Sequence, residues 1–365
     1  MVDMAVQRID AAEGLVPAAV PLWQAPLWPR LLVNAARPGG APVATMGDIL
    51  VRLGLDRPET LAALIGGWDS ILSAVRPDVV VADFAPALLM AARGRMPALG
   101  VGTGFERPPA GMAHFPSLTG GPPAHDEGQA LDNANAGLAR AGRDPIAALP
   151  AINGADVSLA GVFAELDAYA AWRTEPPVAP AIAGPLPPLS DGGGDEVFVY
   201  GFTAMQPDSE FWHGLAASGL PVRIHVGDAS PALVESICAL GMAFEPQPLP
   251  FARIAARSRL VVSHGGHGFV CSALAAGLPQ VVVHYDMEKR GYGVGLARAG
   301  LGGEVALQDI RREPFAQSLR ALHADAPFAA GVRAAAPAFR ARMTPAFADV
   351  AVAEIRRLAG LAGPA

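Results

Sequence analysis

The sequence is poor in cysteine, in lysine and in charge. Among its 365 residues only Cys238 and Cys271 are cysteines, and Lys289 is the single lysine. Two cysteines cannot build a disulfide framework, and they fit a reducing cytoplasm, which is the expected location. Charged residues make up 17% of the chain, with a net charge of −7. Because nucleic acid requires a basic face, no nucleic-acid partner is expected.

Long apolar runs are also lacking. Hydrophobic residues reach 52%, enough for a large core, but charges such as Asp83, Arg93 and Arg107 interrupt the most apolar stretches. We therefore expect no transmembrane segment, and residues 1–15 carry no signal-peptide pattern. A Walker loop and a G-x-S-x-G nucleophile elbow are absent as well, which argues against two common enzyme classes.

The chain does show a strand–helix–strand alternation. Residues 78–82 (DVVVA) have a continuously apolar centre typical of a buried strand, residues 97–101 read as the next strand, and residues 84–92 between them favour a helix. The same rhythm restarts at residue 196. Residues 17–30, rich in proline, favour an irregular loop. The pattern predicts an α/β protein with doubly wound parallel sheets.

A break in composition separates the two halves. The segment Glu175–Glu196 (EPPVAPAIAGPLPPLSDGGGDE) holds six prolines and four glycines, which favours a linker. We predict a first domain at 1–174, a Pro/Gly linker at 175–196, a second domain at 197–344, and a C-terminal helix at 345–365 that packs back on the first domain. A ligand cleft between two such domains is expected.

The most informative segment runs from Ser263 to Gly302. An apolar strand at 260–262 leads into a glycine-rich turn, which opens a helical stretch at 269–276. Backbone N–H groups and the helix dipole make such a turn an anion site, and glycines let a phosphate approach the backbone. The turn residues are His264, Gly265, Gly266 and Gly268.

This segment resembles the signature of nucleotide-sugar-dependent glycosyltransferases of the two-Rossmann (GT-B) type, in the antibiotic, macrolide and UDP-glucuronosyltransferase branch. That signature reads His-Gly-Gly-x-Gly-Thr-x-x-Glu-Ala-Leu-x-x-Gly-Val-Pro. The chain matches it without a gap at His264, Gly265, Gly266, Gly268, Ala273, Leu274, Gly277 and Pro279. Residues 77–104 are similar to the strand–helix–strand of the family's acceptor-side domain.

The resemblance implies two Rossmann-like domains facing a cleft and transfer of a sugar from a nucleoside-diphosphate sugar to a small acceptor. It implies neither a metal nor a cofactor beyond that co-substrate. The family's donor diphosphate site falls on His264, Gly265, Gly266, Gly268 and Thr203. Its ribose and sugar positions fall on Ser272, Glu288 and Lys289, its base site on Leu249 and Phe251, and its catalytic acid, which orients a general base, on Asp83.

Several positions depart from the family pattern. Phe269 replaces a hydroxyl residue that contacts phosphate, Ser272 replaces the glutamate that holds the ribose, and Glu288-Lys289 replaces an Asp-Gln pair. Against the family, the first domain is expected to lack its first β-α unit, on the order of 35 residues, which carries the catalytic histidine. Asp83 would alternatively cap a helix, and Lys289 would meet a phosphate, a carboxylated sugar or only solvent.

These departures leave other functions open. The chain is alternatively a catalytically degenerate nucleotide- or sugar-binding protein or a partner protein of this fold, or a nucleotide-sugar epimerase-like enzyme, because fold does not fix function. Whether it is an active enzyme therefore stays open, and so does a homodimer. His264, His267, His284 and Cys271 lack the spacing of a metal site, so no metal is expected.

Overall fold

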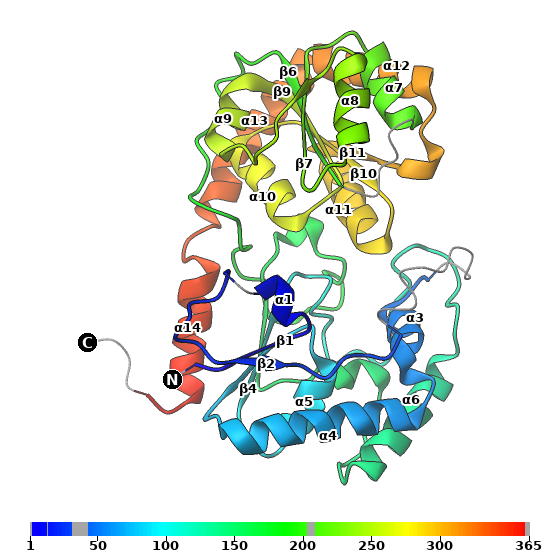
Figure 1. Cartoon of the computed structure of the whole chain (residues 1–365), viewed down its shortest axis with the longest axis vertical. Helices are drawn as coiled ribbons and strands as arrows, with labels where there is room; N and C mark the ends of the chain where they lie inside the picture. The colour runs from blue at the N-terminus through cyan, green and yellow to red at the C-terminus, as the bar shows by residue number, and fades with distance from the viewer. Residues whose placement is uncertain (1, 13, 31–42, 203–208, 362–365) are drawn as a thin grey trace. The chain divides into compact units, whose positions relative to one another are not determined.

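The computed structural model describes residues 2–12, 14–30, 43–202 and 209–361, and Figure 1 shows the course of the chain. Thr203, predicted to contact the donor phosphate, lies outside these residues. The chain forms two compact units. Unit 1 takes its described residues from 1–160, 171–176 and 349–365, and unit 2 takes them from 161–170 and 177–348. None of the helices in the described ranges is both long and apolar enough to cross a membrane.

Unit 2 is built on a parallel sheet of six strands. In chain order these are β6 (Glu196–Gly201), β7 (Val222–Val226), β8 (Ala243–Phe244), β9 (Ser258–Ser263), β10 (Gln280–His284) and β11 (Gly302–Ala306). Their spatial order is β11-β10-β9-β6-β7-β8, the order of a Rossmann fold. The chain moves outward in opposite directions from β6 and β9, so this pair forms the switch point of the sheet.

Helices cover both faces of this sheet, as Figure 1 shows. Val197 and Val199 of β6 pack with α7 (Glu210–Ala217), α8 (Pro231–Ala239) and α12 (Arg312–Ala324). Phe198, between them, points to the other face and packs with α9 (Phe251–Arg257) and α10 (His267–Ala276). Side chains alternate along a strand, so one apolar run serves two cores. The predicted doubly wound architecture is confirmed.

Further helices complete unit 2. The helix α11 (Met287–Arg298) packs against β10 and β11, and α13 (Ala326–Ala341) packs against α10. We had not predicted β11, because its sequence, GGEVA, carries little β propensity. β11 pairs with β10 along the whole length of that strand, and this pairing stabilises a strand that the local sequence does not favour.

Unit 1 contains two parallel sheets. The first pairs β1 (Met4–Val6) with β2 (Leu22–Gln24), and the second has the order β3 (Val80–Asp83), β4 (Ala98–Gly102), β5 (Val157–Ala160). The helices are α1 (Ile9–Ala12), α3 (Met46–Leu50) with a π-helical turn at Val51–Leu55, α4 (Pro58–Val75), α5 (Pro86–Ala92) and α6 (Glu127–Arg140). The helix α14 (Phe347–Leu358) ends the described chain. The loop predicted for residues 17–30 is wrong at β2, where pairing with β1 overrides the surrounding prolines.

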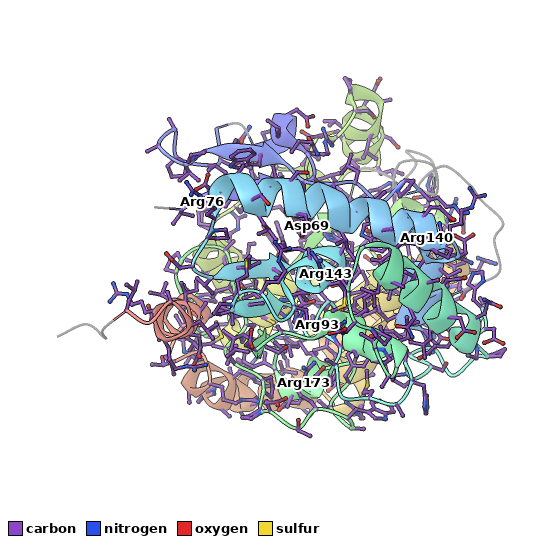
Figure 2. All side chains as sticks on the ribbon, turned by 90° about the horizontal axis from the view of Figure 1, so that it is seen from below. Asp69, Arg76, Arg93, Arg140, Arg143 and Arg173 are labelled. Atoms are coloured by element: carbon purple, nitrogen blue, oxygen red, sulfur yellow. The ribbon has the colours of Figure 1, made fainter. Side chains whose placement is uncertain are left out.

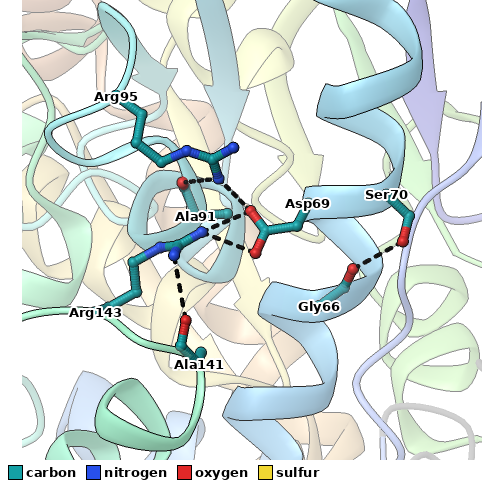
Figure 3. Close-up of polar contacts among 7 residues, drawn as sticks. All are labelled: Gly66, Asp69, Ser70, Ala91, Arg95, Ala141 and Arg143. Carbon is teal, nitrogen blue, oxygen red and sulfur yellow. Dashed lines mark hydrogen bonds and ion pairs between the residues drawn. The ribbon is translucent and has the colours of Figure 1, made fainter.

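An aspartate on α4 joins three segments of unit 1. Figure 3 shows Asp69 between two guanidinium groups, those of Arg95 and Arg143. Arg143 Nη2 donates to both carboxylate oxygens at 2.6 and 2.8 Å. In Figure 2, Asp69 lies along α4 between Arg76 and Arg140. The cluster fixes α4 against the turn before β4 and the loop after α6.

A buried carboxylate, that of Asp48, holds the loop that precedes α6. Asp48 is only 1% exposed, and its oxygens accept backbone N–H groups from Ala44, Thr45, Ala124 and His125 at 2.9 to 3.0 Å. Burial alone would raise the pKa of Asp48, but these four hydrogen bonds together hold it below its ordinary value. Asp48 therefore ties α3 to a segment more than 70 residues away.

We expect Asp48→Ala to lower the free energy of unfolding by about 3 kcal/mol or more, since it leaves four backbone donors without their acceptor. Asp126→Ala, which removes one exposed N-cap bond of α6, is the matched control and should cost about 1 kcal/mol. Urea unfolding of both variants measures the difference. Because the folded pKa of Asp48 is depressed, its stabilisation is present above the unfolded pKa and lost as the pH falls through the folded pKa. Equal losses in the two variants at neutral pH would contradict this role for Asp48.

Candidate functional site

The predicted phosphate loop lies at the switch point of the unit 2 sheet. It leaves the end of β9 beside the end of β6, and the backbone N–H of His264 donates to the carbonyl of Tyr200 at 3.2 Å. In open parallel sheets, ligands bind outside the carboxyl ends of the strands at such a switch point. The topology therefore places the glycine motif at the position where a ligand is expected.

Two of the loop glycines are required by close packing. Gly265 has φ +86°, and a Cβ there would stand 2.8 Å from Val282 Cγ1 and 3.1 Å from Lys289 Cβ. At Gly266 a Cβ would stand 3.1 Å from His264 Nε2. Gly268 is less constrained, because its nearest neighbour would be at an ordinary 3.6 Å. The loop is thus folded tightly between β10, α11 and the His264 ring.

The loop ends at the N-terminus of α10. Gly266 is the N-cap residue, and no side-chain hydrogen bond caps this helix within the described part of the chain. The first backbone N–H groups of a helix lack intrahelical partners, and they attract anions together with the helix dipole. An uncapped N-terminus beside a histidine is therefore suited to a phosphate group.

His264 is half-buried between aromatic rings. Its ring centroid lies 5.1 Å from that of Tyr200 and 5.9 Å from that of Phe202. Burial lowers the pKa of His264, the charge of Lys289 acts in the same direction, and a 3.4 Å contact between Nδ1 and the Tyr200 carbonyl opposes both. The imidazole is therefore neutral at neutral pH, and Nε2 lies on the side of Gly266.

A pocket of about 370 Å³ lies beside this loop within unit 2. It brings together Leu249, Phe251, Gly268 and Ser272, which the sequence had assigned to the base, the diphosphate and the ribose. The volume lies within the range of small-molecule sites. These four residues, which are separated in the sequence, thus line one cavity, and Ser272 is only 4% exposed.

Aromatic rings form much of the pocket wall. Phe269 stacks against Tyr200 at 5.2 Å and against Phe198 at 6.2 Å between centroids, and it meets Phe251 at 5.3 Å. Where the family pattern has a hydroxyl, this chain therefore has a ring at the centre of an aromatic cluster. Such a wall favours a flat, apolar guest.

The Pro-rich segment supplies another wall. Residues 183–188 line the pocket, and the N–H of Ser190 donates to the carbonyl of Ala276 at 2.8 Å. Arg340 donates to the carbonyl of Pro187. The segment predicted as a linker is packed on unit 2 from residue 177 onward.

Glu288 and Lys289 lie in the first turn of α11. Asp286 is the N-cap and accepts the N–H of Lys289 at 2.9 Å. Lys289 Nζ forms an ion pair with Glu288, whose other oxygen accepts the Tyr292 hydroxyl at 2.8 Å. Burial would lower the pKa of Lys289, but Glu288 and Asp286 raise it overall. The Lys289 side chain is 16% exposed, so it is a paired group and not a solvated charge.

Asp83 lies in unit 1 at the end of β3. It is not a helix cap, because α5 has Ala85 at its N-cap and no side-chain cap bond. Although the residue is exposed, partial desolvation and the neighbouring Glu106 raise the pKa of Asp83, and Arg107 opposes them. The next residue, Phe84, has φ +37°, a strained value for a side chain of this size.

The sequence reasoning missed several pocket residues, among them two with polar side chains, Tyr200 and His225. Both lie near the carboxyl ends of adjacent strands, β6 and β7, and their rings stack at 6.0 Å. The histidine within the apolar run VRIHV was the available signal. Of the histidines weighed as metal ligands, His284 pairs with Glu304 at 2.6 Å. Residues 2–12, 14–30, 43–202 and 209–361 contain no group of three or more side chains arranged to hold a metal ion.

Comparison with known proteins supports the fold. No family model and no curated protein matches the sequence. Among solved structures, the calicheamicin glycosyltransferase CalG4 is similar with a TM-score of 0.67 and 21% identity, over 99% of this chain and 91% of its own. The glycotransferase of kitacinnamycin has a TM-score of 0.65 and 16% identity, over 98% and 91% of the two chains. Glycosyltransferase VinC, in complex with dTDP, has a TM-score of 0.59 and 16% identity, over 98% and 99%.

These likenesses extend over both units, so the chain has the GT-B fold. The neighbours are glycosyltransferases of antibiotic type, the branch whose signature the segment 263–302 resembles. The expected fold class is confirmed.

We expect Gly265→Ala to lower the free energy of unfolding by about 2 kcal/mol, since a left-handed φ costs a side chain roughly 1–2 kcal/mol and the new Cβ must displace Val282. Gly291→Ala, on neighbouring α11, is the control, because a Cβ there meets nothing within 4 Å. That change should be neutral or stabilising by up to about 1 kcal/mol. Chemical denaturation compares the variants, and a Gly265→Ala protein as stable as the wild type would show that the loop is not under this constraint.

Proposed function

We propose that this protein is a glycosyltransferase that moves a sugar from a nucleoside-diphosphate sugar to a small acceptor. One observation carries the proposal. The uncapped N-terminus of α10 and His264 lie beside the 370 Å³ aromatic pocket at the switch point of a GT-B fold. The pocket suits a nucleoside, and the helix N-terminus suits the diphosphate attached to it.

The donor would extend from the pocket across the glycine loop. Its nucleoside would lie against Leu249, Phe251 and Ser272, and its diphosphate against Gly266, Gly268 and the His264 ring. Because Nδ1 donates to the Tyr200 carbonyl, Nε2 would donate to a phosphate oxygen once the charge of the diphosphate has favoured protonation of the ring. Glu288 and Lys289 lie next to Gly265, so their ion pair would offer both an acceptor and a donor to the sugar hydroxyls.

The reaction would break the bond between the anomeric carbon and the diphosphate oxygen and form a new bond to the acceptor oxygen. Negative charge grows on the departing diphosphate, where helix N–H groups and His264 would stabilise it. The acceptor hydroxyl loses its proton, and we assign Asp83 to accept it. The raised pKa of this carboxyl makes it a stronger base than an ordinary aspartate. No metal or further cofactor is required in this scheme.

The structural neighbours favour sugar transfer over the two alternatives, a binding or partner protein and an epimerase-like enzyme. The structural neighbours are named as glycosyltransferases, and one of them was solved with dTDP. We carry their donor class to this chain as part of the proposal. A homodimer has no support from the structure of the single chain, and we do not propose one.

The first test concerns donor binding. His264→Ala should weaken the binding of UDP and dTDP by roughly 10- to 100-fold, since it removes a hydrogen bond to a charged phosphate. His125→Ala, on an exposed loop of unit 1, is the control and should leave the affinity within about twofold. Calorimetric titration gives the dissociation constants. Failure of the wild type to bind any nucleoside diphosphate would overturn the proposed function.

The second test separates an enzyme from a binding protein. With a nucleotide-sugar donor and a panel of apolar hydroxylated acceptors, the wild type should release nucleoside diphosphate in an acceptor-dependent way. Asp83→Asn should lower kcat by about 100-fold or more and leave donor affinity unchanged, because the amide cannot take a proton. Glu106→Gln is the matched control and should reduce kcat far less. Donor binding without any release would show a binding protein and not a transferase.

A further inference from the structure

His225 is a buried histidine whose ring is oriented by the backbone. It lies on β7 and is 4% exposed. Its Nδ1 lies 2.9 Å from the carbonyl oxygen of Glu245. A carbonyl oxygen only accepts, so Nδ1 carries the hydrogen and donates it. The ring stacks nearly parallel to Tyr200, with 4° between the planes, which fixes its rotation.

The position of the ring hydrogen determines whether Nε2 of His225 donates or accepts a hydrogen bond. In a neutral imidazole with hydrogen on Nδ1, Nε2 is a pure acceptor. The bond to Glu245 is the only hydrogen bond of the His225 side chain among the residues described, so Nε2 has no partner there. His225 lines the aromatic pocket together with Leu249 and Phe251. An acceptor on a side chain that lines a mostly apolar cavity favours a guest that brings an N–H or O–H group.

The position of His225 in the pocket also indicates which part of the donor contacts its ring. Phosphate belongs at the N-terminus of α10, which reaches the pocket at Gly268 and Phe269. His225 lies on the strand beyond β6, on the side away from β9, and the pocket wall between carries the Tyr200 and Phe269 rings. Aromatic faces suit a flat heterocycle. The nucleobase of the donor therefore meets His225.

We propose that His225 Nε2 selects the donor nucleobase by accepting a ring N–H, so that the site takes uracil, thymine or guanine and rejects cytosine and adenine. This inference rests on the proposed function and adds the residue that determines base choice. Uracil and thymine carry hydrogen on N3 and guanine on N1, whereas cytosine N3 and adenine N1 carry lone pairs. A lone pair opposite Nε2 leaves two acceptors facing each other, and both lose their hydrogen bonds to water.

Two matched ligand pairs test the proposal by calorimetric titration at about pH 8, where imidazoles are neutral. UDP and CDP have the same size and the same phosphates, and so do the purine pair GDP and ADP. The wild type should bind UDP at least about tenfold more tightly than CDP, the ratio that corresponds to one unpaired buried group. Any GDP binding should exceed ADP binding by a similar factor.

Two variants of His225 test whether Nε2 causes the preference for UDP over CDP. His225→Asn keeps an N–H for the Glu245 carbonyl but has no atom at the Nε2 position, so UDP should weaken by about tenfold and CDP by less than about threefold. His225→Phe keeps the stack on Tyr200 and serves as a second variant if the first is poorly folded. His125→Ala, which changes an exposed side chain of unit 1 and no residue of the pocket wall, should keep the wild-type ratio.

The outcomes are distinguishable. Wild-type protein that binds UDP and CDP equally well overturns the selection by His225 but leaves the proposed function standing. A UDP/CDP ratio that stays above tenfold in both folded variants also overturns it. Absence of binding to all four nucleotides overturns the proposed function and this inference together.

Discussion

The site depends on one constraint, the adjacency of β6 and β9 at the centre of the unit 2 sheet. The two strands pair in register up to Tyr200 and Ser263, and the next backbone group, His264 N–H, bonds to the Tyr200 carbonyl. The helices that follow them, α7 and α10, pack on opposite faces of the sheet, which makes this pair of strand ends the switch point at which ligands bind in open sheets. The glycine loop, the Tyr200 ring and the N-terminus of α10 all take their positions from this pairing.

The polar and apolar parts of the site have separate sources. Backbone groups and His264 form the part that we propose binds the anion, where the glycines leave no room for side chains. Alternating strand residues and the first turns of α9 and α10 form the aromatic pocket. Most of the pocket is therefore non-specific apolar surface, and its chemical selectivity lies in the side chains of Tyr200, His225 and Ser272 and in the backbone groups that line it.

The sequence predicted the parts of the fold in which local signals agree with the tertiary structure. The runs at 78–82 and 97–101 coincide closely with β3 and β4, and the gap-free motif from His264 to Pro279 covers the loop before α10, α10 itself and the turn after it. Strands β2, β5 and β11 escaped prediction because their order comes from pairing with a neighbouring strand and not from the local sequence. His225 escaped because the inward-facing side of a strand, and the tautomer set by a distant carbonyl, are properties of the folded chain. The ion pair of Lys289 is also a property of the folded chain, because the sequence around a single lysine does not indicate whether its side chain is buried.

The wall formed by residues 183–188 also bears on how such proteins can be recombined. These residues come before β6 in the chain, yet they line the same pocket as residues from α9 and α10. A chimaera joined to a relative at residue 196 would take one pocket wall from one parent and the pocket floor from the other. A junction at residue 177 would transfer the wall, the floor and the strand that carries His225 as a single inherited piece.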